Sequence, residues 1–299
     1  MRITANTMYD QIRTDISRLT DQQAKTEYSI SSGKIYNTPS DAPVALTHAL
    51  SVREEISDVD QYKRNITYAK GWMSASESAM SQVQDRLLRA KTLAIQGAND
   101  SQDATSRKAL AEEVKSILNE VVALGNTKIG DRYVFGGTKT RGYGPGEAPF
   151  VMEPDGTVKY LGNRQNLGIN VATDQTLNIN TNGHQAFIQS GIFTSLKHLE
   201  DALNNNSQTD TESALAQIDT ALNYTNQQIS SMGARDNSLD VHKDMADQTL
   251  IDSKKRLSDI QDTDIVQAIT DLKTEQTSYQ AALAAAAKVM NVSLVNYLK

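Results

Sequence analysis

The 299-residue chain contains no cysteine, which excludes disulfide bonds, thiolate metal sites and a cysteine nucleophile. Aromatic residues make up only 5% of the sequence and apolar residues 38%, both below the averages of globular domains. We therefore expect a thin, aliphatic core. Lysine and arginine total 30 against 36 acidic residues, a net charge of −6. Because no excess of positive charge is available for a phosphate backbone, nucleic-acid binding is disfavoured.

Long hydrophobic runs are also missing. The longest apolar stretch of small side chains, residues 281–287, is far shorter than the roughly 20 residues that span a bilayer. Residues 1–10 are mostly polar, unlike the apolar segment of a secretory signal peptide. The sequence therefore predicts a soluble chain with neither a membrane anchor nor an N-terminal signal.

The usual sequence signals of enzymes are absent as well. The histidines, at positions 48, 184, 198 and 242, form no HExxH motif and have no carboxylates at a spacing that suits zinc. No phosphate-binding loop or nucleophile elbow occurs, and the glycines of residues 142–146 do not match a dinucleotide fingerprint but read as a flexible loop. We expect no enzyme activity, no catalytic residue, no cofactor and no metal.

Charged residues have structural interpretations. The acidic run 259–264 could suggest calcium, but it lacks the glycine and the closing glutamate of an EF-hand loop. Capping of a following helix by Asp262, Thr263 or Asp264 is favoured instead. The pair Glu112 and Glu113 lies near Arg107 on a predicted helix, which indicates a solvated, salt-bridged helix face.

Glycine and proline gather in one window. Of the 16 glycines, 11 fall between positions 130 and 191, and three of the five prolines fall between 145 and 154. Within it, residues 150–153 and 157–160 flank a Pro-Asp-Gly turn, which predicts a β-hairpin. Apolar residues then alternate with polar ones from Leu167 to Ile179. We predict a small inserted antiparallel β domain.

Outside this window, apolar residues recur in alternating steps of three and four, the spacing of one stripe on a helix. Five stripes follow this rule: Tyr9, Ile12, Ile16, Leu19, Gln23, Thr26 and Ile30; Ile66, Ala69, Met73, Ser76, Met80, Val83, Leu87, Ala90 and Ala94; Leu110, Val114, Ile117, Val121 and Leu124; Leu215, Ile218, Leu222, Thr225, Ile229 and Met232; and Ile265, Ile269, Leu272, Gln276, Tyr279, Leu283, Ala286 and Met290. The predicted fold class is therefore mainly α, an elongated rod of long coiled-coil-type helices.

The second stripe belongs to one long helix. Ser40, Asp41 and Pro43 supply its start, and Gly97 with Asn99 supplies its end. Gly71 inside it is a soft point that costs about 1 kcal/mol relative to alanine. Gly233 is expected to interrupt the fourth stripe. Arg235 beside it either lies on the surface, the favoured interpretation, or braces a neighbouring helix through a carboxylate.

The two terminal stripes carry polar residues among the apolar ones, so an isolated chain gains little from burying them. Two interpretations are about equally supported. Either the terminal helices pack on each other or on the central helices, or they remain mobile and become ordered against copies in neighbouring subunits.

Several segments resemble the flagellin superfamily. These segments are MRITANTM at residues 1–8, SISSGKIYNTPSDAP at 29–43, GDRYVFGG at 130–137, GARDN at 233–237 and YQAALAAAAKVMNVSLVNYL at 279–298. The resemblance covers roughly residues 1–140 and 210–299, and the glycine-rich middle matches only in kind. At residues 39–43 the sequence reads PSDAP, where flagellins usually carry a charged DDAAG-type run, which favours a junction protein over a filament subunit.

The resemblance implies a secreted, structural, self-assembling subunit of the bacterial flagellum that serves motility. It would leave the cell by flagellar type III export and form a ring of identical copies at the hook–filament junction, between hook-associated protein 1 and flagellin. It also implies three regions: a terminal helical assembly domain at 1–40 and 262–299, a helical rod domain at 41–130 and 200–261, and the inserted β domain at 131–199. An export chaperone would mask the C-terminal stripe, with Tyr279, Leu283 and Met290 as candidates.

Carried onto this sequence, the resemblance makes the terminal stripes the assembly surface. The candidate partner-binding residues are Ile12, Ile16, Leu19, Ile30, Ile265, Ile269, Leu272, Tyr279, Leu283 and Met290. An inter-domain bend would use Gly33, Pro39 and Pro43, although an ordinary interhelical loop is an equally simple interpretation. The alternatives are a flagellin-type filament subunit and, less favoured, a glycan-binding or hydrolytic module in residues 131–199.

Overall fold

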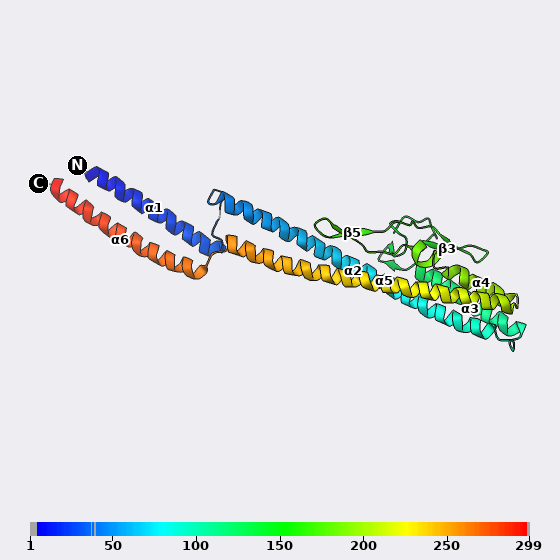
Figure 1. The fold of residues 1–299 in the computed structure, drawn as a ribbon. Coiled ribbons are helices and arrows are strands. Elements are labelled where there is room, and N and C mark those ends of the chain that lie inside the picture. Colours follow the sequence, from blue (N-terminus) through cyan, green and yellow to red (C-terminus); the bar gives the residue numbers. More distant parts are fainter. Residues whose placement is uncertain (1–4, 37, 39, 298–299) are drawn as a thin grey trace. The chain divides into compact units, whose positions relative to one another are not determined.

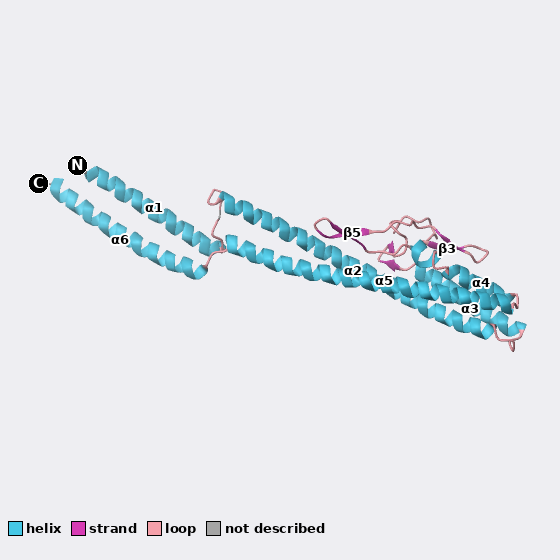
Figure 2. Ribbon diagram, in the orientation of Figure 1, coloured by secondary structure: helices cyan, strands magenta, loops and turns pink. Residues whose placement is uncertain are grey.

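The computed structural model describes the backbone of residues 5–36, 38 and 40–297 and the side chains of residues 7–36, 38 and 40–288. Its α-helices are α1 (Ala5–Ser32), α2 (Pro43–Gly97), α3 (Ala104–Gly125), α4 (Ile192–Asn204), α5 (Gln208–Gln261) and α6 (Ile265–Tyr297). Between α3 and α4 the chain forms short strands and one five-residue π-helix, η1 (His184–Ile188) (Figure 2). The predicted class, mainly helical with small antiparallel β elements inserted, is confirmed.

Helix α2 has nearly the predicted bounds. Pro43 is its first residue, a position where the missing N–H is not needed, and the Ala42 carbonyl accepts the first helical bond from the Leu46 amide at 2.9 Å. All members of the predicted stripe are buried, namely Ile66, Ala69, Met73, Ser76, Met80, Val83, Leu87, Ala90 and Ala94.

Helix α5 corrects one prediction, because it continues through Gly233 to Gln261. A single glycine costs about 1 kcal/mol in a helix. The surrounding turns bury Met232 and Leu239 almost completely, and this packing outweighs the glycine penalty. The predicted interruption at Gly233 is therefore wrong. Gly71 likewise lies within an unbroken α2.

The strands form three separate antiparallel pairs. β3 (Phe150–Met152) pairs with β4 (Val158–Tyr160), with Phe150 opposite Tyr160, and the intervening Gly156 has φ +80°, as the predicted Pro-Asp-Gly turn requires. β5 (Gly168–Ala172) pairs with β6 (Gln175–Asn178) where the apolar alternation was expected. The pair β1 (Lys128–Ile129) and β2 (Arg132–Tyr133) was not predicted.

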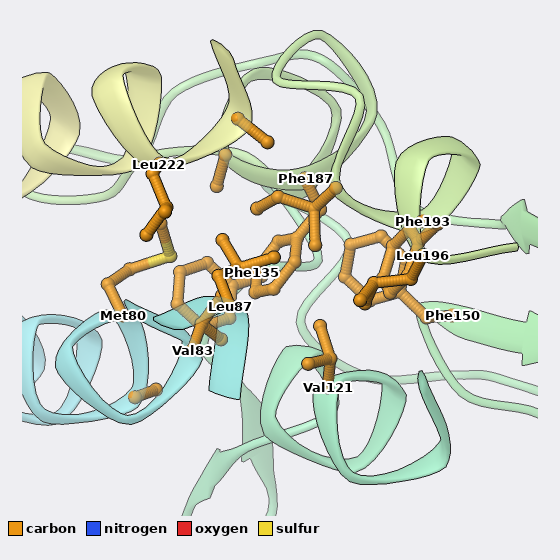
Figure 3. Close-up of a cluster of buried hydrophobic side chains, with 14 of the residues drawn as sticks. Met80, Val83, Leu87, Val121, Phe135, Phe150, Phe187, Phe193, Leu196 and Leu222 are labelled. Atoms are coloured by element: carbon orange, nitrogen blue, oxygen red, sulfur yellow. The ribbon is translucent and has the colours of Figure 1, made fainter. Parts of the chain in front are cut away.

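The chain divides into two compact units, one running from Val59 to Gln248 and the other formed by the residues before and after it. The Val59–Gln248 unit contains an aromatic cluster, which the expectation of an aliphatic core did not include. All four phenylalanines of the sequence, Phe135, Phe150, Phe187 and Phe193, meet there, with neighbouring ring centroids 5.0–5.6 Å apart. Figure 3 shows them among side chains of α2, α3, α4 and α5.

Helix α4, which was not predicted, helps to enclose this cluster. Ile192, Leu196, Leu199 and Leu203 are fully buried, and α4 packs against α3. The nearby Tyr160 hydroxyl donates to the Phe135 carbonyl at 2.8 Å, and burial raises the pKa of Tyr160 to about 12. The β elements are therefore attached to the helices through a shared core.

Two arginines differ from expectation. Arg107 was expected on a solvated face, but only 6% of it is exposed, and its guanidinium donates to the carbonyls of Gly97 and Asn99 and to Asn206 Oδ1. Arg235 donates to the backbone carbonyl of Asn180 at 3.0 Å, so it braces a loop of the β region rather than a carboxylate. In both cases the acceptor comes from a turn or loop that helix periodicity cannot locate.

Ion pairs connect α2 to α5 within the Val59–Gln248 unit. Lys63 pairs with Asp247 at 2.5 Å and Lys91 with Asp219 at 2.6 Å, and Lys70 contacts Asp240. The hydrogen bond to Asp240 raises the pKa of Lys70, and the hydrogen bond from Lys63 lowers the pKa of Asp247. These contacts show that the two long helices run antiparallel.

Candidate assembly surface

Helices α1 and α6 form an antiparallel pair. Their Cα atoms approach within 8 Å, and Figure 1 shows the N- and C-terminal ends of the chain at the same end of the pair. The seam contains several small side chains. Ala268, Ala282 and Ala286 of α6 provide them, since Ala268 is 7% exposed and the other two are half-buried.

The other end of this pair is closed by backbone hydrogen bonds. The Thr263 amide donates to the Gly33 carbonyl at 2.9 Å, and the Ile35 amide donates to the Gln261 carbonyl at 2.8 Å. Asp264 then caps α6, because its Oδ1 accepts from the amides of Val266 at 2.9 Å and Gln267 at 3.1 Å. The predicted capping of this helix is confirmed.

The residues predicted to form a bend lie in the connection from α1 to α2. Gly33 follows α1 directly with φ +70°, a conformation that glycine adopts without strain. Asp41 Oδ2 accepts from the Thr38 amide at 2.9 Å, which tightens the turn before Pro43, and Pro39 lies outside the described residues. This geometry is compatible both with a bend and with an ordinary loop.

On α1, the candidate residues share one face. Ile12, Ile16, Leu19 and Ile30 are all half-buried, and α6 is the helix that packs against them. The opposite face is polar, with a shallow depression lined by Asp10, Arg13, Thr14, Ser17, Arg18 and Asp21. Helix α1 therefore has a single apolar stripe, and the partner helix in the same chain occupies it.

On α6, the candidate residues divide into two groups. Leu272 and Tyr279 are half-buried, whereas Ile265, Ile269 and Leu283 are 40%, 54% and 43% exposed. The side chain of Met290 lies outside the described residues. We call the three exposed residues, Ile265, Ile269 and Leu283, the outer flank of α6.

The face of α6 that meets α1 shares Leu272, Tyr279 and Ala286 with the predicted stripe and extends to one side of it. Ala268, Glu275 and Ala282 are buried or half-buried, at intervals of seven residues. Sequence reasoning missed these positions because two are small and one is charged. The heptad spacing itself was the available signal.

A polar contact crosses this seam. Thr26 Oγ1 donates to Glu275 Oε1 at 3.1 Å. Glu275 Oε2 is also buried, and it has no hydrogen-bond partner among the described residues. Within α1 and α6, Ala268 is the one described apolar residue less than 9% exposed. The terminal helices thus pack on each other, but through a thin seam that leaves much apolar surface uncovered.

Across the described residues, no group of three or more histidine, aspartate and glutamate side chains is placed to hold a metal ion. In the same part of the chain, no helix is long and apolar enough to cross a membrane.

Comparison with known families gives two matches. Residues 3–140 match the bacterial flagellin N-terminal helical region, and residues 215–298 match the bacterial flagellin C-terminal helical region. Together the two matches cover about three quarters of the chain, including all of α1, α2, α3 and α6 and most of α5. The unmatched part contains most of the β elements and α4.

Individual relatives have more specific names. The chain is 25% identical to flagellar hook-associated protein 3 of Escherichia coli K12, over 100% of both chains. It is 29% identical to flagellar hook-associated protein 3 of Salmonella typhimurium LT2, over 62% of this chain and 57% of the relative. A solved structure of a putative flagellar hook-associated protein from Vibrio parahaemolyticus has a TM-score of 0.66 at 22% identity, covering 74% of this chain and 100% of the other.

Proposed function

This chain belongs to the bacterial flagellin family, and from that membership we propose that it is a structural subunit of the junction between the hook and the filament. Its relatives are flagellar structural proteins and not enzymes, so it is a component of the flagellum. The observation that carries the junction proposal is the match over the entire length of hook-associated protein 3 from Escherichia coli.

In the proposed role, copies of this chain form a ring between hook-associated protein 1 on one side and flagellin on the other. The terminal helix pair supports this proposal, since its thin seam and the exposed outer flank leave apolar surface for neighbours to cover. The candidate residues on α1, together with Leu272 and Tyr279 on α6, would stabilise the helix pair itself. The outer flank would form contacts between copies.

In this proposal the chain has the three regions expected from its sequence. They are an assembly domain (1–40 and 262–299), a helical rod domain (41–130 and 200–261) and an inserted β domain (131–199). Residues 33–43 would then act as the bend between the first two. We further propose that the subunit is secreted by flagellar type III export, with an export chaperone covering Tyr279, Leu283 and Met290 before assembly. Chaperone affinity should fall when these three residues are replaced by serine, and unchanged affinity would remove them as its contact surface.

A flagellin-type filament subunit is the competing function. The experiment that separates the two uses purified protein with isolated hooks that carry hook-associated protein 1. We expect the protein to add to hook ends in a limited amount and then to permit filament growth when flagellin is supplied. Growth of long filaments from this chain alone, after seeding, would instead establish the filament role.

A further inference from the structure

Helix α6 has an apolar face wider than α1 can cover, so it could meet α1 in two rotational settings. In the observed setting the seam contains Ala268, Glu275 and Ala282. In the other setting, reached by a turn of roughly 60° at about 100° per residue, the outer flank of Ile265, Ile269 and Leu283 would face α1. Leu272, Tyr279 and Ala286 would remain near the seam in both.

Apolar burial alone favours the setting that is not observed. Turning the outer flank inward would bury isoleucine and leucine side chains in place of alanine, at roughly 25 cal/mol per Å² of apolar area. The same turn would return the Glu275 carboxylate to water and remove the cost of a buried, half-satisfied charge. Some other contact must therefore stabilise the observed setting.

We infer that the hydrogen bond from Thr26 to Glu275 selects the rotational setting of α6 and so keeps the outer flank exposed. The bond is 3.1 Å long and partly buried, and hydrogen bonds to charged groups are stronger than neutral ones. No ion pair joins α1 to α6 among their described residues, since the salt bridge on α1 lies within that helix, between Arg18 and Asp15. A polar contact in a helix seam is known to fix helix arrangement at a cost in stability.

Other features of the helix pair constrain the rotation of α6 about its axis less strongly. The backbone bonds between residues 33–35 and 261–263 hold one end of the pair, but they involve no α6 side chain and leave the rotation of α6 open. The small alanines of the seam fit against α1 in the observed setting, but they would also tolerate the rotated setting on their own. Thr26 and Glu275 are therefore positioning residues for the outer flank.

This inference rests on the proposed function only in treating the outer flank as the surface that neighbouring copies cover. The rotational setting itself can be measured on the full-length chain without assembly. Because the sequence contains no cysteine, a single introduced thiol reports the exposure of one position. Leu283→Cys places a thiol on the outer flank, and Ala268→Cys places one in the seam.

The test is Thr26→Val, which keeps the volume and β-branching of the side chain and removes the donor. Glu275 would then be buried without a partner, so α6 is expected to turn. Maleimide labelling of the thiol from Leu283→Cys should slow roughly tenfold and that of the thiol from Ala268→Cys should accelerate, because an unmet hydrogen bond to a charged group changes an equilibrium by about that factor. Adding Glu275→Ala to Thr26→Val should keep the turned labelling pattern, because the selecting hydrogen bond is still absent and apolar burial alone favours that setting.

Thr20→Val is the matched control, because the Thr20 hydroxyl donates to the Ile16 carbonyl of its own helix at 2.9 Å. It should leave both labelling rates unchanged. If Thr26→Val accelerates labelling at both positions, the pair opens rather than turns, and the inference is wrong. Unchanged rates would also overturn it.

Assembly is a separate measurement on the same chain. Ile269→Ser should weaken addition to hook ends without altering the labelling pattern of the pair. If labelling follows the inference while Ile269→Ser assembles normally, the outer flank is not the assembly surface and the proposed role of that surface fails, while the Thr26 to Glu275 selection stands.

Discussion

Arg107 holds a charged guanidinium where only 6% of the residue is exposed, and it joins two turns that are far apart in the sequence. Its three acceptors are the carbonyls of Gly97 and Asn99 and the side chain of Asn206. Replacing it with alanine leaves the buried Gly97 carbonyl and two partly buried acceptors without this donor. We expect Arg107→Ala to lower the free energy of unfolding by about 2–3 kcal/mol, measured by urea denaturation.

Arg89 provides the matched control for this prediction. It pairs with Glu113 at 2.6 Å, but the two side chains are 50% and 41% exposed, so solvent screens their attraction. Arg89→Ala should change the free energy of unfolding by less than about 1 kcal/mol. Equal losses for the two arginines would show that the buried contacts of Arg107 are not what stabilises this end of the unit.

The different environments of these two arginines also show why the burial of a single charged residue could not be predicted from the sequence. Charge and helix spacing place Arg89, Arg107 and Glu113 on similar solvated faces. The structure separates them because the acceptors for Arg107 come from two interhelical turns. Glu275 is the same case on the candidate surface, since its partner Thr26 lies at the opposite end of the chain. Contacts between residues distant in sequence leave no periodic signal.

Each of the two long helices, α2 and α5, contains one glycine in its interior that could be replaced by alanine. Gly71 in α2 and Gly233 in α5 have no atom within 4 Å of a built Cβ and no positive φ. Neither packing nor backbone conformation therefore requires glycine there. We expect Gly71→Ala and Gly233→Ala each to raise the free energy of unfolding by up to about 1 kcal/mol in a denaturant titration.

Substitution of Gly130 is the control that distinguishes the effect of backbone conformation from the effect of packing. It too has open space around a built Cβ, but its φ is +59°, in the turn between β1 and β2. Gly130→Ala should therefore destabilise the same unit by about 1 kcal/mol. Stabilisation by all three substitutions would contradict the account based on φ.

Among the elements, the long stripes were predictable because each repeats over many turns of one helix. The stripe of α2 is buried at every predicted position, and the β3–β4 hairpin follows from its turn residues. Helix α4 was missed although Ile192, Leu196, Leu199 and Leu203 have helical spacing, because it lies next to the glycine-rich window. On α6 the packed face shares Leu272, Tyr279 and Ala286 with the predicted stripe, whereas its other positions are small residues and Glu275.

At the scale of the molecule, the buried side chains are very unevenly distributed. The largest fully buried ones, including Trp72, Phe135 and Phe187, belong to the Val59–Gln248 unit. The terminal helix pair has only its thin seam. The two parts should therefore respond differently when one terminal helix is removed.

Deleting residues 265–299 removes α6 and uncovers the single apolar stripe of α1. Most of the stability of a helix in a protein comes from packing of its apolar face, so α1 should unfold as well, and far-UV circular dichroism should lose more helix than the 33 residues of α6 account for. The main thermal transition, set by the Val59–Gln248 core, should move by no more than a few degrees. The truncated chain should no longer add to hook ends. A chain that keeps α1 helical, or that still assembles, would show that the partnership of α1 with α6 is dispensable, because nothing else described in the structure covers the stripe of Ile12, Ile16 and Leu19.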